Sequence, residues 1–283
     1  MILVADSGAT KTDWGFGDCL TDLRLVRTEG INPFHQDEGT IRRILKEQLS
    51  PQIPHGNEEV THIHFYGAGC TPEKSVSIRR ILQESFPSAI EIHAESDLLG
   101  AARASCGHEV GIACILGTGS NSCLYDGKDI IDHIPPLGYI LGDEGSGAYL
   151  GKRFVSDCLK RQLPESLLNG LLDEYRLTPS LLLDHVYRMP QANRFLAGLT
   201  PYISKHKKNP LVHRFLIDCF DDFFRRNVYL YGNKWPVSFV GSIGWHFQEE
   251  IRESASAAGF TIRSFIKSPI NGLVRYHLEN THI

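Results

Sequence analysis

The chain has 283 residues, of which 42% are hydrophobic, so it can bury one large core or two medium ones. A formal net charge of −4, without a basic block carrying interleaved aromatics, argues against a nucleic-acid-binding surface. Seven scattered cysteines without a CxxC pair indicate reduced thiols rather than a disulfide framework or a zinc site. No basic leader and no apolar run of membrane-spanning length is evident, so we expect a cytoplasmic globular protein without a membrane partner.

Residues 1 to about 106 alternate strand and helix patterns. The opening stretch MILVADSGATKTDWGFG predicts a β-hairpin, and LRLVRTEG predicts a third strand. A helix is predicted from Asp37 to Leu49, where apolar residues recur at helical spacing. The strand THIHFYGAG then precedes the helix PEKSVSIRRILQESF, and the strand IEIHAES precedes the helix DLLGAARAS.

The same pattern starts again in the second part of the chain. GIACILGTGSNSCLYDG reads as strand, Gly-rich turn and strand, and FVGSIGWHFQEEI repeats the strand, glycine loop and helix order of FYGAGCTPEKSVSI. The two hairpin turns can be aligned with Gly8 on Gly119 and Thr10 on Asn121. We interpret this as an internal duplication of a βββαβα unit.

Helical patterns fill the chain from Gly147 to about Tyr231, which predicts an insertion in the second repeat. In LVHRFLIDCFDDFFRRNVYLY one apolar stripe predicts a core-facing helix; it contains Leu211, Phe215, Cys219, Phe220 and Phe223. We therefore predict an α/β protein with domains at residues 1–107 and 108–269 and a helical insertion at about 147–232. A C-terminal helix at 270–283 is expected to pack back on the first domain.

Both predicted hairpin turns suit phosphate binding. DSGATKT and GTGSNS offer backbone N–H groups, hydroxyl donors and, in the first turn, a lysine, while glycine lets an anion approach the chain. Asp6 could hold Mg²⁺ directly or through water. Ordinary tight turns use the same residue types, so either turn alone is ambiguous. Two turns matched across a duplication favour phosphate binding, and no P-loop or GxGxxG offers another nucleotide site.

The motifs DSGATKT, SDLLGAA, GTGSN, LGDEGSG and FVGSIGW, in this order, resemble the N-acetylglucosamine kinase and BadF/BadG/BcrA/BcrD ATPase family. This family belongs to the sugar kinase–Hsp70–actin superfamily, and the resemblance covers nearly the whole chain. It implies two ribonuclease-H-like domains facing a cleft, with ATP between them. It also implies a cytoplasmic kinase that phosphorylates N-acetylglucosamine or a related amino sugar at the 6-hydroxyl, and it leaves room for a homodimer.

The resemblance assigns roles to particular residues. Asp97 matches the catalytic base, and the sugar-binding positions are Asn32, Asp97, Gly138 and Asp143. The ATP-binding positions are Gly8, Thr10, Lys11, Gly117, Thr118, Gly119, Asn121, Ala197, Gly241 and Ser242. Asp97 could instead be a simple helix N-cap, and Asp143 and Glu144 could be acids at a helix start.

Some features leave the function open. IPPLGYI, before LGDEGSG, departs from amino-sugar kinases of the animal type, so the exact sugar is not determined. One alternative is an ATPase activator with an iron–sulfur cluster shared across a dimer, and another is a non-catalytic sugar sensor. His62 and His64 alternate on a strand without a third metal ligand, and we interpret them as ordinary strand residues.

Overall fold

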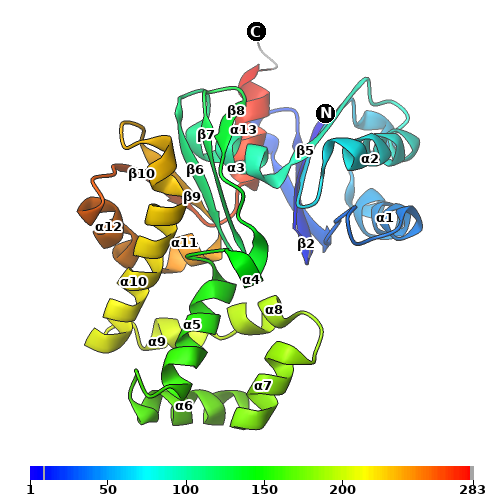
Figure 1. The fold of residues 1–283 in the computed structure, drawn as a ribbon. Helices are drawn as coiled ribbons and strands as arrows, with labels where there is room; N and C mark the ends of the chain where they lie inside the picture. The colour runs from blue at the N-terminus through cyan, green and yellow to red at the C-terminus, as the bar shows by residue number, and fades with distance from the viewer. Residues whose placement is uncertain (9, 281–283) are drawn as a thin grey trace. The chain divides into compact units, whose positions relative to one another are not determined.

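The computed structural model describes residues 1–8 and 10–280, which form two compact units. Each unit contains one five-stranded sheet with helices packed against it (Figure 1). Unit 1 comprises Met1–Glu109, Asp126–Ile130 and Ser268–Ile283, and unit 2 comprises Val110–Tyr125 and Ile131–Lys267.

Unit 1 contains every strand and helix predicted for the first third of the chain. Its strands are β1 (Ile2–Ser7), β2 (Lys11–Gly17), β3 (Arg24–Glu29), β4 (His62–Gly67) and β5 (Glu91–Ser96). Its α-helices are α1 (Glu38–Ile44), α2 (Pro72–Ser85), α3 (Asp97–Cys106) and α13 (Ile270–Asn280). A short π-helix at Leu45–Leu49 continues α1, and short 3₁₀ helices lie at Leu20–Asp22, Ser50–Gln52 and Asn57–Glu59. The sheet order is β3-β2-β1-β4-β5, with β1 antiparallel to β2 and parallel to β4.

The alternation of side chains along β1 decides which side each residue of the first turn faces. Leu3 and Ala5 pack into the core beside α1 and α2, whereas Ile2 and Val4 pack against α13. Asp6 therefore lies on the face that α13 and α3 cover, and Ser7 lies on the opposite face.

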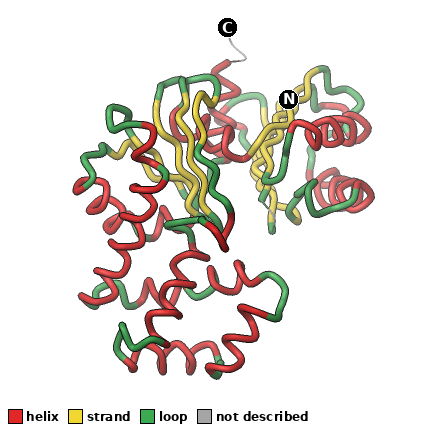
Figure 2. Tube along the Cα trace, viewed as in Figure 1, coloured by secondary structure: helices red, strands yellow, loops and turns green. Residues whose placement is uncertain are grey.

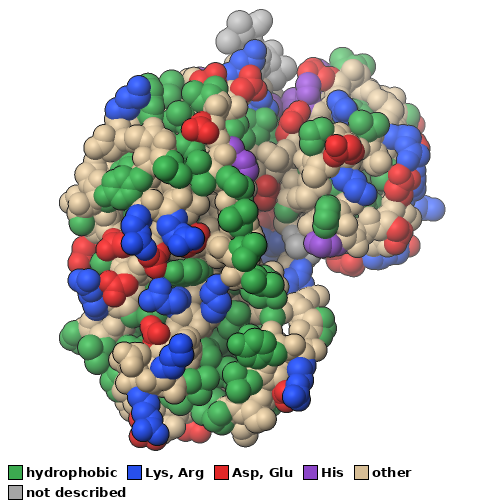
Figure 3. All heavy atoms as spheres, viewed as in Figure 1, with side chains coloured by type: hydrophobic (Ala, Val, Ile, Leu, Met, Phe, Trp, Pro, Cys, Tyr) green, Lys and Arg blue, Asp and Glu red, His purple; other side chains and the backbone are tan. Residues whose placement is uncertain are grey.

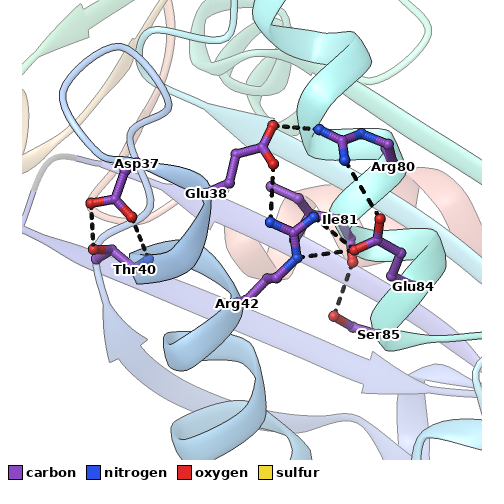
Figure 4. Close-up of polar contacts among 8 residues, drawn as sticks. All are labelled: Asp37, Glu38, Thr40, Arg42, Arg80, Ile81, Glu84 and Ser85. Atoms are coloured by element: carbon purple, nitrogen blue, oxygen red, sulfur yellow. Dashed lines mark hydrogen bonds and ion pairs between the residues drawn. The ribbon is translucent and has the colours of Figure 1, made fainter.

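Helices α1 and α2 are joined on their outer side by a chain of ion pairs (Figure 4). Arg42 contacts both Glu38 and Glu84, at 3.0 and 2.8 Å, and Arg80 contacts Glu38 from α2. Because these side chains are well exposed, each pair contributes little stability, and apolar packing holds the two helices on the sheet.

Unit 2 repeats the sheet of unit 1. Its strands are β6 (Gly111–Leu116), β7 (Ser120–Tyr125), β8 (Ile130–His133), β9 (Val237–Val240) and β10 (Ile262–Ile266), in the order β10-β9-β6-β7-β8. Its helices are α4 (Gly138–Leu141), α5 (Gly147–Leu159), α6 (Glu165–Tyr175), α7 (Pro179–Tyr187), α8 (Ala192–Ala197), α9 (Thr200–Lys205), α10 (Pro210–Arg226), α11 (Ser242–His246) and α12 (Gln248–Ala257), with a 3₁₀ turn at Val228–Tyr231.

The two sheets have equivalent strand orders when β1–β5 are matched with β6–β10. Helices α5–α10 fall between β8 and β9, and Figure 2 shows α6 and α7 at the end of unit 2 away from its strands. The predicted fold class, a duplicated ribonuclease-H-like α/β unit with a helical insertion in the second copy, is confirmed.

Two details of the prediction are wrong. In α10 the predicted stripe begins with Leu211, but this side chain is half exposed and Val212 is buried instead, whereas the other four stripe residues are buried as predicted. The alignment of Gly8 with Gly119 also fails. Gly8 N donates to Lys11 O, whereas Gly117 N donates to Gly119 O, so Gly8 is equivalent to Gly117 and the first turn is one residue longer.

The surface of unit 2 has no large area of a single charge on the face drawn in Figure 3, where acidic and basic side chains alternate with apolar ones. None of the helices in residues 1–8 and 10–280 has both the length and the apolar character that a membrane crossing requires.

Candidate active site

The first hairpin turn connects β1 to β2 and is closed by a hydrogen bond of 3.0 Å from Gly8 N to Lys11 O. Thr10 is exposed, and its carbonyl oxygen accepts a hydrogen bond of 3.1 Å from Gly30 N. The predicted phosphate turn is therefore joined directly to the loop that carries Asn32.

Three carboxylates gather on the α13-facing side of this hairpin. Asp6 lies opposite Asp13 in the β1–β2 register, and burial, together with the charges of Asp13 and Asp97, raises the pKa of Asp6 to about 7. Lys11 opposes this shift. Two like charges this close favour protonation of one of them or the presence of a cation.

Asp13 stays ionised because two cations hold it. Lys11 Nζ and Arg27 Nε each lie 2.6 Å from a different oxygen of its carboxylate. Although burial acts in the opposite direction, hydrogen bonds from Arg27 and Lys11 lower the pKa of Asp13. The predicted phosphate-binding Lys11 thus has its ammonium group placed by Asp13.

Asp97 is the first residue of α3, but it does not cap that helix. The N-cap is Ser96, whose hydroxyl accepts a hydrogen bond of 3.2 Å from Leu99 N. Burial raises the pKa of Asp97, although backbone N–H groups of Leu98 and Asp97 partly offset this effect. Among residues 1–8 and 10–280, no side chain donates a hydrogen bond to this carboxylate. The simple-cap interpretation of Asp97 is therefore wrong.

Asn32 is nearly buried in the loop between β3 and α1. Its Oδ1 accepts a hydrogen bond of 3.0 Å from Phe34 N. Gly69, at φ +76°, packs so closely that a Cβ there would overlap Asn32 Oδ1. Because the oxygen is used within the protein, the Nδ2 group is the part of Asn32 suited to a ligand hydroxyl.

The second hairpin turn lies in unit 2 and leads directly to the start of α5. Gly147 N donates to Gly117 O at 2.8 Å, and Ala148 N donates to Thr118 O at 3.0 Å. The Thr118 side chain is exposed. The exposed Thr118 hydroxyl and the open face of Gly117 are therefore available to a ligand, while the carbonyl groups of the turn anchor the helix.

Asp143 lies against this turn. Its Oδ1 accepts a hydrogen bond of 3.3 Å from Ser120 N, and a Cβ on Gly119 would lie 3.0 Å from its Oδ2. The backbone is left-handed here, with φ +56°. Burial is the main cause that raises the pKa of Asp143, and the charge of Glu144 adds to it.

The alternative interpretation required Asp143 and Glu144 to lie at the start of a helix, but neither residue does. Helix α5 begins at Gly147 with Ser146 as its N-cap, three residues after Asp143. Glu144 is buried and forms an ion pair of 2.7 Å with Arg226 from α10. The pair fixes the loop, which leaves the Asp143 carboxylate to face the turn.

Other predicted nucleotide positions also lie beside this turn. A Cβ on Gly147 would lie 3.1 Å from the Ala197 Cβ, and one on Gly241 would lie 2.5 Å from Leu116 O. Ser242 follows Gly241 as the exposed first residue of α11. Unit 2 thus brings Ala197, Gly241 and the GTG turn together.

Two predicted residues are placed differently. Asn121 Oδ1 accepts a hydrogen bond from Ser122 N and also lies 2.9 Å from Nε2 of His133, which belongs to β8. The Asn121 side chain is therefore directed towards β8. Gly138 starts α4 at φ +74°, and a Cβ there would meet open space. Its link to the site is indirect, because Gly142 N donates to Gly138 O just before Asp143.

Comparison with known proteins decides the family. No protein-family model and no curated protein matches the sequence. A crystal structure from Porphyromonas gingivalis, described as that of a candidate N-acetylglucosamine kinase, is 45% identical, covers 100% of both chains and superposes with a TM-score of 0.95. The chain belongs to the N-acetylglucosamine kinase family.

Two more distant structures share the fold of this kinase. A candidate N-acetylglucosamine kinase from Chromobacterium violaceum is 16% identical, covers 97% of this chain and 98% of its own, and has a TM-score of 0.74. A ROK-family glucokinase from Streptomyces griseus, in complex with glucose and AMPPNP, is 13% identical over 97% of both chains, with a TM-score of 0.62. The predictions of the family and of an enzyme of the sugar-kinase class are confirmed.

The sequence did not point to several residues that shape the site of this kinase. Asp13 lies two residues after Lys11 on the same strand. Because alternate residues of a strand share one face, this spacing could have indicated that the two side chains are neighbours. Gly69 and Arg226 gave no local signal, because their partners Asn32 and Glu144 lie 37 and 82 positions away in the chain.

Proposed function

We propose that the protein is an ATP-dependent kinase that phosphorylates the 6-hydroxyl of N-acetylglucosamine or a related amino sugar. The observation that carries the proposal is Asp97. Its carboxylate is partly buried and has a raised pKa, and it is not the N-cap of α3, because Ser96 has that role. A carboxylate in this state is a better proton acceptor than an ordinary surface aspartate.

In the proposed reaction the sugar 6-oxygen attacks the γ-phosphorus of ATP as its proton moves to Asp97. The bond from the γ-phosphorus to the bridging oxygen breaks, and ADP leaves. Such transfer depends mainly on positioning and on stabilisation of the charge on the transferred group. The proposal assigns sugar contacts to Asn32 and Asp143.

The phosphates are assigned to the two hairpin turns. In unit 1 these contacts come from the Gly8–Lys11 turn, where Asp13 places the Lys11 ammonium. In unit 2 they come from the turn at Gly117–Gly119, where the exposed Thr118 offers a hydroxyl. The residue segments of both predicted domains, 1–107 and 108–269, are required by this proposal.

Asp6 fits a magnesium ion that accompanies ATP. Burial raises its pKa, and the charges of Asp13 and Asp97 raise it further; a divalent cation would relieve the repulsion among these carboxylates. When bound, the ion would neutralise phosphate charge.

The test is a coupled ADP-release assay with a panel of amino sugars and hexoses. We expect ADP release to rise at least tenfold with N-acetylglucosamine or a close relative, and 6-deoxy-N-acetylglucosamine to give no such rise. Equal ADP release with and without every sugar would disprove the kinase proposal. Turnover of the 6-deoxy sugar would disprove the assignment of the 6-hydroxyl alone.

A further inference from the structure

Two buried hydroxyl groups lie at the base of the first hairpin turn. Ser7 ends β1 and Thr12 faces it in the β1–β2 register, and both residues are fully buried. Their oxygens are 2.6 Å apart. The proposed reaction gives neither group a role, because both point to the side of the sheet opposite Asp6.

Both hydroxyls bind the backbone of the loop that carries Asn32. Ile31 N donates to Ser7 Oγ at 3.0 Å and to Thr12 Oγ1 at 3.2 Å, and Ser7 Oγ donates to Ile31 O at 2.8 Å. Since the single Ser7 proton goes to Ile31, Thr12 must donate to Ser7. The donors and acceptors at this point are therefore all matched, and loss of either hydroxyl leaves a buried polar group with fewer partners.

The rest of the loop is fixed at neighbouring positions. Gly30 N donates to Thr10 O in the turn. Gln36 accepts from Asn32 N at 2.8 Å and donates to Gly30 O at 2.8 Å. Asn32 thus follows directly after the residue that Ser7 and Thr12 hold.

We infer that Ser7 and Thr12 are positioning residues that fix Asn32 relative to the phosphate turn, so that nucleotide and amino sugar bind with mutual dependence. The inference rests on the proposed function for the identity of the two ligands. The positioning itself rests only on the hydrogen bonds within unit 1. By thermodynamic linkage, nucleotide must raise sugar affinity by the same factor as sugar raises nucleotide affinity.

The variants Ser7→Ala, Thr12→Val and Thr12→Ser test the inference in the full chain. Thr12→Val keeps the shape and removes the hydroxyl, whereas Thr12→Ser retains the hydroxyl. The matched control is Thr28→Val. Thr28 is the β3 partner of Thr12, is also buried and accepts a hydrogen bond of 3.0 Å from Trp14 Nε1, but its side chain makes no hydrogen bond to residues 30–36.

The first measurement is amide hydrogen exchange of residues 30–36 in the free protein. We expect exchange roughly tenfold faster in Ser7→Ala and Thr12→Val, as for the loss of one or two buried hydrogen bonds. Thr12→Ser and Thr28→Val should stay within about twofold of the unmodified protein in this segment. Unchanged exchange in both Ser7→Ala and Thr12→Val would overturn the positioning role, whether or not the protein phosphorylates a sugar.

The second measurement is the Kd of N-acetylglucosamine by calorimetry, with and without saturating Mg²⁺ and AMPPNP. We expect nucleotide to tighten sugar binding by about fivefold or more in the unmodified protein, within the usual range of coupling, and by less than twofold in Thr12→Val. Equal coupling in both proteins would overturn the mutual dependence. Failure of the unmodified protein to phosphorylate any sugar would instead disprove the proposed function, and the exchange result would still decide the positioning role.

Discussion

At the residue scale, two neighbouring side chains have different roles at the start of α3. Ser96 supplies the capping hydrogen bond, and Asp97 keeps a carboxylate that no cap requires. The same division recurs before α5, where Ser146 caps the helix and Asp143 lies three residues upstream. In both places a serine, and not the acid, provides the capping hydrogen bond of the helix.

Asp97→Asn tests the base. We expect kcat to fall by roughly 10²–10⁴-fold, the usual worth of general acid–base catalysis. The melting temperature should stay the same or rise slightly, because burial disfavours the charge that this change removes. The measurement is kcat and melting temperature on one preparation.

Ser96→Ala is the matched control for this variant. It should lower the free energy of unfolding by about 1 kcal/mol, the usual cost of losing an N-cap, while kcat stays within a few-fold. Near-normal turnover of Asp97→Asn would end its assignment as the base and direct attention to Asp143.

Gly117→Val tests the phosphate turn of unit 2. A Cβ at this position meets no protein atom closer than 4.0 Å, so the fold should tolerate the change. The added methyl groups would occupy the space assigned to phosphate, and we expect the KM for ATP to rise about tenfold or more as backbone approach is blocked. Steady-state kinetics and thermal melting check this. A folded variant with an unaltered KM would show that the turn is structural only.

At the element scale, helix α13 is joined to the sheet through a stack of aromatic rings. His277 on α13 lies face to face with His64 on β4 at a ring distance of 3.5 Å, and His64 stacks on His93 of β5 at 5.4 Å. The Tyr66 hydroxyl accepts a hydrogen bond of 2.8 Å from Arg103 and forms a second hydrogen bond, also of 2.8 Å, with His277 Nε2. Burial, which lowers the pKa of His277, keeps this ring neutral.

This stack predicts a loss of stability in acid. Burial, with the nearby charges of other histidines and Arg103, lowers the pKa of His64 to about 4 and of His277 to about 2. Below about pH 6.5 these histidines take up protons in the unfolded state but not in the folded state. The free energy of unfolding is therefore highest above that pH, as far as these residues contribute, and it falls as the pH is lowered towards 4. The slope approaches about 1.4 kcal/mol per pH unit for each histidine.

The measurement is urea unfolding between pH 4 and 7.5 for the unmodified protein and His64→Phe, which keeps the stacked ring. We expect a shallower slope in the variant. Asp6, with its raised pKa, acts in the opposite direction in both proteins and cancels in the difference. Equal slopes for His64→Phe and the unmodified protein would contradict the prediction.

These elements also show how far sequence reasoning reached. Period-two and helical patterns predicted each strand and helix of unit 1, because local burial dictates them. The role of His64 was not predictable, since its stacking partner His277 lies 213 positions away. The stripe residues Phe215, Cys219, Phe220 and Phe223 are buried as predicted, and only Leu211, in the first turn of α10, lies outside the buried face, where Val212 is buried instead. The motif residues Asp143 and Glu144 were found, but the contacts of Asp143 with Ser120 and of Glu144 with Arg226 depend on tertiary packing.

At the scale of the whole molecule, the duplication has kept the sheet and changed the turns. The strand orders of the two sheets are equivalent, yet one turn carries a lysine held by an aspartate and the other anchors a helix. Chemistry has therefore diverged where the chain leaves the sheet, as is usual for loops on a rigid scaffold.

The distribution of cysteines over the whole molecule separates the kinase from the ATPase-activator alternative. A [4Fe–4S] cluster shared across a dimer needs about four thiolates, hence two accessible cysteines from each chain. Within residues 1–8 and 10–280, Cys19 is exposed and Cys70, Cys106, Cys114, Cys123, Cys158 and Cys219 are buried. Burial raises the pKa of Cys158 to about 12 and opposes formation of its thiolate.

We therefore expect protein treated anaerobically with iron and sulfide to remain colourless after desalting and to retain no stoichiometric iron. Visible absorption and iron analysis of the unmodified protein and Cys19→Ser provide the measurement. A brown product that depends on Cys19 would support the activator and contradict the kinase proposal.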